Sequence, residues 1–182
     1  GETGQVHSFE PVKEYFQRLN NLLGANKEYH VVANRCAVGD EERTASIAVT
    51  SLPNIGWNTM VPDFMSQETI KQRVEVPTCR LDRYIREKAL RRISLIKIDT
   101  EGFEFPVLKG LSGYFEETRD RPRIICEIAP EAYPLLGSTL GQLREYMEQH
   151  GYRAFSLIDL DAEIDITKLE KTTDVGFMPS WS

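Results

Sequence analysis

The sequence predicts an α/β fold, with a mostly parallel sheet, helices on both of its faces and an antiparallel edge near the carboxyl terminus. Two observations support this. Short apolar runs rich in β-branched residues alternate with longer runs in which apolar residues recur at helical spacing. The clearest case is the buried-strand pattern of residues 93–98, which a turn connects to a helical pattern over residues 103–117. A chain of 182 residues fits one domain, which we expect to span residues 1–182.

The predicted elements of the amino-terminal half begin with a strand and a helix. They are a strand over residues 5–9, a helix over 12–23, a strand over 29–33 that continues over 36–38, and a strand over 44–50. Pro11 suits the first turn of the helix because its missing N–H has no partner there, and Gly24 suits the helix end. Residues 51–72 follow no regular period. Such a long segment is often a lid or a binding loop, and a loosely packed insertion is the alternative.

The carboxyl-terminal half carries the remaining predicted elements. They are a short strand over residues 74–77, helices over 81–89, 103–117 and 139–149, and strands over 93–98, 123–128, 152–158 and 174–178. Pro77 places the first of these strands at an edge, since proline cannot donate to a ladder. Ser138 is predicted to cap the helix that follows it. Residues 159–170 are acidic and are expected to be exposed.

Composition excludes several classes of function. The net charge is −6, the sequence pI is near 5.2, and no basic cluster occurs beyond Arg91-Arg92, which argues against broad nucleic-acid binding. The three cysteines, Cys36, Cys79 and Cys126, are expected to be buried free thiols in a reducing compartment. Histidines and cysteines are too scattered to predict a metal site. No apolar run approaches the roughly 20 residues that span a bilayer.

Acidic residues stand where two predicted buried strands end. Asp99 and Glu101 follow one strand, and Glu127 lies near the end of the next. Because ligands of α/β sheets bind at the carboxyl ends of strands, this is the predicted site. The alternative for Asp99 is a role as helix N-cap alone. Lys97 shares a strand face with Asp99, and a buried lysine needs a partner, for which Asp99 or Glu127 is our hypothesis.

From the amino terminus to about residue 128, the chain resembles the FkbM family of methyltransferases. The matching residues, in order, are 6–11 (VHSFEP), 36–40 (CAVGD), 81–82 (LD), 96–104 (IKIDTEGFE) and 107–110 (VLKG). The resemblance implies a Rossmann-like class I methyltransferase fold, which is a three-layer sandwich. It also implies S-adenosylmethionine as cofactor and transfer of a methyl group to a hydroxyl, of a sugar, a glycan or a natural product.

The resemblance assigns cofactor contacts at the ends of three strands. Glu10 would accept the ribose hydroxyls, in the way an acid holds the ribose of a dinucleotide. Ala37 and Val38 would lie near the adenine, and Asp99 would contact the cofactor near its methyl sulfonium. The alternative for Glu10 is a solvated acid that interacts favourably with the positive end of its helix.

The acceptor side follows from the same resemblance. Asp99 and Glu101 would lie between the methyl group and the acceptor, and one of them would take the proton of the hydroxyl. Glu101 and Glu127 would also bind the substrate, because carboxylates accept hydrogen bonds from sugar hydroxyls. For Glu127 the equal alternative is a structural pair with Lys97.

One part of the family pattern is missing from the sequence. Members normally begin with a strand and a glycine-rich turn that holds the methionine portion of the cofactor, whereas this chain opens at the second expected strand. The chain is therefore expected to be incomplete at its amino terminus, to receive the strand from another chain, or to have lost cofactor binding and act as a binding module. Methylation of RNA or protein is a further alternative. We expect a cytoplasmic location, and a homo-oligomer is compatible with the sequence.

Overall fold

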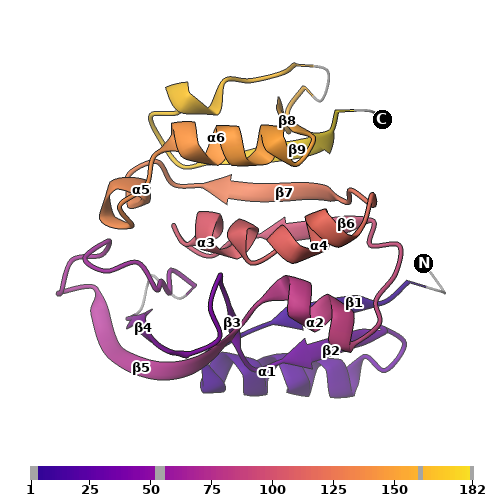
Figure 1. Ribbon diagram of the computed structural model, residues 1–182. Coiled ribbons are helices and arrows are strands. Elements are labelled where there is room, and N and C mark those ends of the chain that lie inside the picture. Colours follow the sequence, from indigo (N-terminus) through magenta and orange to yellow (C-terminus); the bar gives the residue numbers. More distant parts are fainter. Residues whose placement is uncertain (1–3, 52–55, 160–161, 181–182) are drawn as a thin grey trace.

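The structure is a computed structural model that describes residues 4–51, 56–159 and 162–180. Its strands and helices form a mixed α/β fold (Figure 1), which confirms the α/β part of the predicted fold class. The start of the expected opening segment (1–3), part of the irregular segment (52–55) and part of the acidic segment (160–161) lie outside the described residues.

The first sheet is a parallel pair. Strand β1 (Val6–Phe9) pairs with β2 (Val31–Asn34), and helix α1 (Lys13–Ala25) connects the two strands. The helix begins where Glu10 Oε1 accepts a hydrogen bond from Val12 N at 2.8 Å. Glu10 therefore satisfies one of the amide groups that a helix start leaves unpaired.

The second sheet has three strands in the order β3-β5-β4, namely β3 (Ala37–Val38), β5 (Ile70–Cys79) and β4 (Thr44–Thr50). The prediction of a short edge strand over residues 74–77 is wrong, because β5 has 10 residues and pairs on both sides. Pro77 is tolerated because neighbouring amides of a strand point to opposite sides. Thr78 N donates to Arg43 O beside β4, so the nitrogen of Pro77 faces the other side, where β3 pairs only with Thr78 and Cys79.

The third sheet has four strands in the order β6-β7-β9-β8. They are β6 (Leu95–Ile98), β7 (Arg123–Ile128), β9 (Thr173–Pro179) and β8 (Tyr152–Ser156). β6 and β7 are parallel, whereas β9 is antiparallel to both of its neighbours. The antiparallel carboxyl-terminal edge is therefore confirmed. The single, mostly parallel sheet is confirmed only in part, since the described strands form three sheets and include antiparallel pairs.

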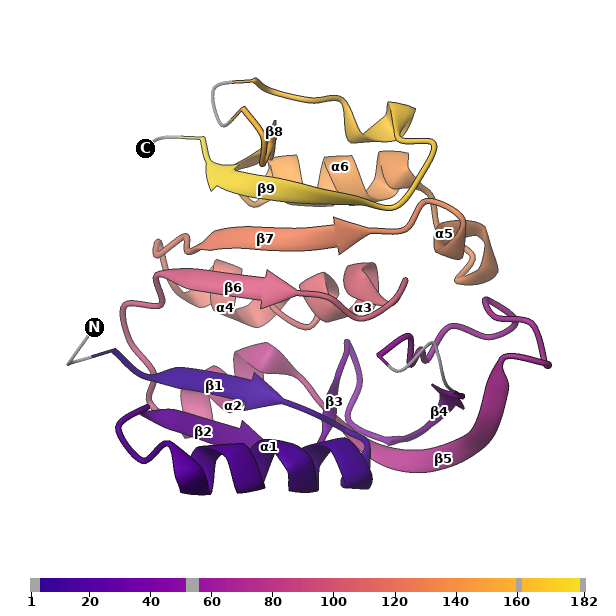
Figure 2. The same ribbon diagram turned by 180° about the vertical axis from the view of Figure 1, so that it is seen from behind.

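Strands β1 and β6 run in the same direction and face each other across a space in Figure 2, and no ladder joins them within the described part of the chain. Val6 at the start of β1 and Leu95 at the start of β6 are 58% and 53% exposed. Each strand thus presents one edge whose backbone groups have no strand partner there.

Helices lie on both sides of the strands, but on the second side only α1 of the described helices lies in front, and β6, β7 and β9 have no helix there, so this prediction is confirmed in part. Figure 1 shows α2 (Leu81–Glu87), α3 (Glu104–Lys109), α4 (Ser112–Glu117) and α6 (Leu140–Gln149) in front of the strands, and Figure 2 shows α1 in front. None of the helices in the described ranges has the length and hydropathy needed to cross a bilayer.

The helix predicted over residues 103–117 is divided in two at Gly110 and Leu111. Gly110 O accepts from Asp82 N at 2.9 Å, and a Cβ added at Gly110 would lie 2.2 Å from Gly39 O. The close approach of these backbones breaks the continuous helix and requires glycine at this position.

Two smaller predictions near the carboxyl terminus are wrong. Thr139, not Ser138, caps α6, because Thr139 and Gln142 form a reciprocal capping box. The Ser138 hydroxyl instead donates to Tyr133 O, in the first turn of the short helix α5 (Ala132–Leu135), which was not predicted from the sequence. Within the acidic segment, Ile166 is only 1% exposed and belongs to the core as part of the 3₁₀ helix η1 (Ile166–Lys168).

Candidate active site

A pocket opens where β1, β3 and β6 end. Its lining residues are Phe9, Glu10, Pro11, Cys36, Ala37, Val38, Ile47, Gly56, Asn58, Met60, Asp99, Thr100 and Glu101. The fold thus brings together most of the residues that the sequence analysis selected, which are Glu10, Ala37, Val38, Asp99 and Glu101. Glu127 does not line this pocket but lies beside its acidic end.

Glu10 stands directly after β1, at the entrance to α1. Its backbone N donates to Asn34 O at 3.0 Å, so β2 fixes its position. Burial raises the pKa of its carboxyl group, against the effect of the Val12 amide, which lowers it. The alternative role of Glu10, an interaction with the positive end of helix α1, is therefore present. The half-buried carboxylate also faces the pocket.

The wall after β3 is small and apolar. Ala37 is 6% exposed and Val38 is half-buried, and both line the pocket. β5 fixes this wall, since Ala37 and Val38 pair in register with Thr78 and Cys79. A flat apolar group can lie against such a wall without stranding a polar side chain.

Asp99 follows β6 and is held by a neighbour on the same strand face. Lys97 Nζ lies 2.5 Å from Asp99 Oδ2, which confirms Asp99 as the partner of Lys97. The expectation that Lys97 is buried is wrong, because its side chain is 55% exposed. The reason is that this face of β6 is uncovered among the described residues, since Leu95, which shares the face with Lys97, is also 53% exposed. The hydrogen bond to Asp99 raises the pKa of Lys97.

Glu101 lies in a strained turn. Its φ is 52°, a left-handed conformation that is uncommon for residues other than glycine, and Gly102 follows with φ 94°. Thr59 Oγ1 donates to Glu101 O at 2.6 Å and holds the turn from the outside. Strain of this kind, fixed by surrounding contacts, is often found at functional sites.

The charge of Glu101 is sensitive to its surroundings. Burial raises the pKa of its carboxyl group to about 7, and the nearby carboxylates of Glu127, Asp99 and Glu104 add to the effect. Near neutral pH this side chain can both release and accept a proton, as a general base must.

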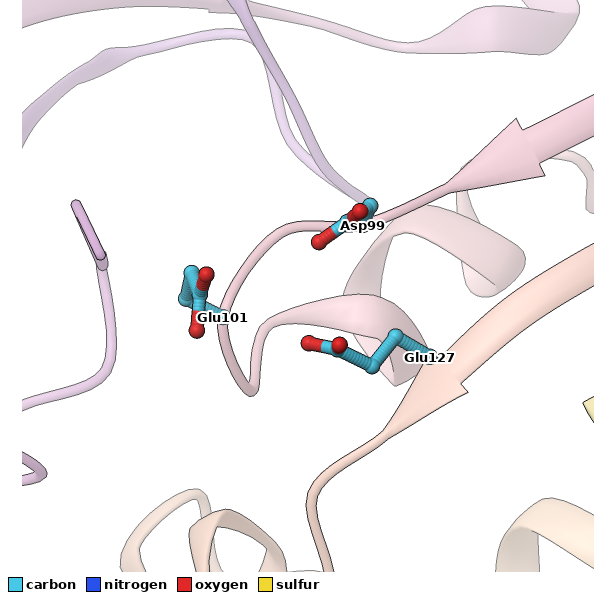
Figure 3. A group of neighbouring side chains, drawn as sticks. All are labelled: Asp99, Glu101 and Glu127. Atoms are coloured by element: carbon cyan, nitrogen blue, oxygen red, sulfur yellow. The ribbon is translucent and has the colours of Figure 1, made fainter. Parts of the chain in front are cut away.

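Three carboxylates gather at the acidic end of the pocket. Figure 3 shows Asp99 and Glu101 on the loop after β6, with Glu127 at the end of β7. Oxygens of all three lie within 4.8 Å of one another. Burial and then Asp99 raise the pKa of Glu127, whereas Lys97 lowers it. The three side chains have the residue types and spacing to share a cation, an arrangement that the scattered histidines and cysteines of the sequence do not indicate.

Other residues of the pocket were also missed by the sequence analysis. Gly56, Asn58 and Met60 line it, and Thr59 reaches the Glu101 turn. All belong to the irregular segment, whose described part therefore packs against the site. No periodicity in the sequence predicts these contacts, and only the unusual length of the segment indicated a possible binding loop.

Comparisons with known proteins give a consistent picture. Methyltransferase 1 of Beauveria bassiana (strain ARSEF 2860) is 30% identical over 124 residues, which cover 58% of this chain and 48% of that protein. This chain thus spans about half the length of that curated relative. The crystal structure of Methyltransferase FkbM from Methylobacillus flagellatus KT aligns over 96% of this chain and 36% of that chain, with a TM-score of 0.53 and 17% identity, and so shares the fold. The family model described as "Methyltransferase FkbM domain" matches residues 1–154, and the chain therefore belongs to the FkbM family of methyltransferases.

Proposed function

We propose that this domain uses S-adenosylmethionine to methylate a hydroxyl group of a sugar, a glycan or a natural product. The observation that carries the proposal is the pocket at the ends of β1, β3 and β6. It joins a half-buried acid, an apolar wall and a second acid with a pKa of about 7. Membership of a methyltransferase family supports the reaction type.

The residue types that line the pocket suit a nucleoside. Glu10 uses Oε1 for the Val12 amide, and its carboxylate has further acceptor capacity for the ribose hydroxyls. Ala37 and Val38 offer an apolar surface to the adenine. The spatial order of strands, β2-β1 followed by β6-β7-β9-β8, is compatible with the two halves of a Rossmann-like three-layer sandwich in one domain.

We assign different tasks to the two acids after β6. The cofactor supplies an electrophilic methyl group when it is bound. Glu101 takes the proton of the acceptor hydroxyl, because its pKa of about 7 suits proton transfer near neutral pH. Asp99 is engaged by Lys97 and orients the acceptor instead. Glu127, within 4.8 Å of both, contributes a further acceptor for sugar hydroxyls.

Titration calorimetry with S-adenosylhomocysteine tests the cofactor role. We expect Glu10→Gln to weaken binding about tenfold or more, the effect of losing a charge-assisted hydrogen bond. Glu14→Gln is the matched control, since Glu14 is an exposed acid in the first turn of the same helix. Equal affinities of Glu10→Gln and Glu14→Gln would contradict the assignment of Glu10. No binding, either by this chain or by a longer form with a strand before β1, would favour the non-enzymatic binding module.

Methyl transfer is tested separately, by formation of S-adenosylhomocysteine with panels of sugars, glycans and natural products, and with RNA and proteins as alternative acceptors. We expect Glu101→Gln to lower kcat by about 10²–10⁴-fold and to leave S-adenosylhomocysteine affinity nearly unchanged. Asp99→Asn is expected to depress transfer more than cofactor binding. Equal loss of both would make Asp99 a cofactor or folding residue.

A further inference from the structure

Two cysteine sulfurs lie beside each other at the wall of the pocket. Cys36 Sγ and Cys79 Sγ are 3.0 Å apart, although the residues are separated by 43 positions in the sequence. Both are free thiols and are half-buried, whereas Cys126 is 0% exposed. The expectation of buried thiols therefore holds for Cys126 alone.

The sheet register explains this proximity. Val38 on β3 pairs with Cys79 on β5, so their side chains project on the same face. Cys36 lies in the bend directly before β3, two residues before Val38, and this bend brings its sulfur beside that of Cys79. Gly39 N donates to Cys79 O at 3.1 Å and holds the two segments together. A disulfide bond is about 2.05 Å long, so the sulfurs need to approach by only about 1 Å.

The two thiols differ in access and in acidity. Cys36 lines the pocket, which gives a small reagent a path to its sulfur. The contact between the two sulfurs lowers the pKa of Cys36, and this same contact together with burial raises the pKa of Cys79. Cys36 is therefore the better nucleophile of the pair, since the thiolate is the reactive form.

We propose that Cys36 and Cys79 form a reversible intrachain disulfide by exchange with a low-molecular-weight disulfide such as oxidised glutathione. The Cys36 thiolate attacks one sulfur of the reagent, which forms a mixed disulfide and releases one reduced thiol. Cys79 then loses its proton and attacks Cys36 Sγ, which forms the Cys36–Cys79 bond and releases the second reduced thiol. The two protein sulfurs are oxidised, and the reagent disulfide is reduced to two thiols.

The bond would change the pocket wall. It would join Cys36 to the end of β5 and remove the hydrogen that Cys79 Sγ now directs to Ala37 O at 3.5 Å. It would also close a loop that contains β3, β4 and most of β5. Closing such a loop restricts the unfolded chain, so we expect the oxidised protein to melt about 5–10 °C higher than the reduced protein.

Intact mass measurement of the folded chain after incubation with oxidised glutathione tests the proposal. The expected product has lost two hydrogen atoms and carries no glutathione, and peptide mapping joins the Cys36 and Cys79 peptides. Cys79→Ser is expected to stop at a stable glutathione adduct on Cys36. Added dithiothreitol should restore the starting mass and the lower melting temperature.

Cys126→Ala is the matched control and is expected to oxidise as the unaltered chain does. Peptide mapping of the unaltered chain assigns the bond even if that variant fails to fold. A stable glutathione adduct on the unaltered chain, an unchanged mass, or a disulfide that includes Cys126 would each overturn the proposal.

Discussion

Glu104 Oε1 accepts a hydrogen bond from Gly102 N at 2.8 Å, from inside the first turn of α3. The same oxygen accepts from Thr100 N and from Thr100 Oγ1, each at 3.1 Å. One buried side chain therefore fixes the backbone on both sides of Glu101. The strained position of the proposed base depends on this carboxyl group, which itself is 0% exposed.

The first prediction concerns this support. Glu104→Ala should lower the free energy of unfolding by about 2–4 kcal/mol, because it leaves buried amide groups without an acceptor and opens a cavity. Glu104→Gln keeps an acceptor oxygen and should cost less than half as much. Urea denaturation measures both values. Equal losses in the two variants would show that the hydrogen bonds to residues 100 and 102 contribute little.

The second prediction concerns pH. The pKa of Glu101 is raised from 4.5 to about 7, so the folded state holds a proton that the unfolded state releases. Its contribution to stability is fully present below pH 4.5 and is lost as the pH rises through 7. The free energy of unfolding of the unaltered protein should therefore fall by on the order of 1 kcal/mol as the pH rises, a value that allows for partial solvent screening. This fall should be absent in Glu101→Gln. Urea denaturation at a series of pH values measures this difference. The prediction would be contradicted if the free energy of unfolding changed equally with pH in both proteins.

The third prediction compares two glycines. Gly110→Ala should destabilise the protein by about 1–3 kcal/mol or more, because the added Cβ would lie 2.2 Å from Gly39 O, which is backbone and cannot move aside cheaply. Gly24→Ala is the control. Gly24 lies in α1 with nothing within 4 Å of an added Cβ, so alanine there should stabilise the helix by about 0.5–1 kcal/mol. Thermal melts that rank the variants in the opposite order would be inconsistent with the fold.

The fourth prediction concerns a buried charge at the start of α2. Asp82 is 5% exposed, and it binds Arg80 through two hydrogen bonds, at 3.1 and 2.5 Å. Asp82→Ala should cost about 3–5 kcal/mol, since it strands the charge of Arg80. Glu117→Ala removes the partner of Arg86 in an exposed pair and should cost at most about 1 kcal/mol. Similar losses in urea titrations would mean that burial does not strengthen the Arg80–Asp82 pair.

The pH dependence of this pair has the opposite sign to that of Glu101. Burial alone would raise the pKa of Asp82, but Arg80 and the amide of Gly113 outweigh it and lower the pKa below its ordinary value of 3.8. The stability from Asp82 is therefore present above pH 3.8 and is lost as the pH falls through the lowered value. The Asp82→Ala variant should therefore be less stable than the unaltered protein near neutral pH. In acid, the difference in free energy of unfolding between the two proteins should become smaller.

Sequence periodicity predicted the elements whose burial is regular. The strands at residues 95–98 and 123–128 and the helix ending at Gln149 were found close to their observed bounds. It failed where tertiary contacts decide. The length of β5 depends on a second strand beside it, and Pro77 is acceptable only because of the side toward which its nitrogen points.

The residues of the candidate site also fall into two groups, those that the sequence could predict and those that it could not. Residues at strand ends could be selected from sequence, because the carboxyl ends of parallel strands meet at one edge of an α/β sheet. Thr59 could not be selected, since its contact with Glu101 O joins two loops 42 residues apart. The proximity of Cys36 to Cys79 required the register of β3 against β5, which no pattern within either segment contains.

The unpaired facing edges of β1 and β6 affect how the protein unfolds locally. Glu10 and Asp99 follow strands of two sheets that share no ladder within the described residues, so no strand pairing joins the two sides of the pocket there. A cofactor held at its ribose by Glu10, together with an acceptor oriented by Asp99, would connect the two sheets across the pocket. Without ligand, the two sheets should unfold locally and independently of each other. We expect bound cofactor to make them unfold together, which would slow amide hydrogen exchange in β1 and β6 by a similar factor.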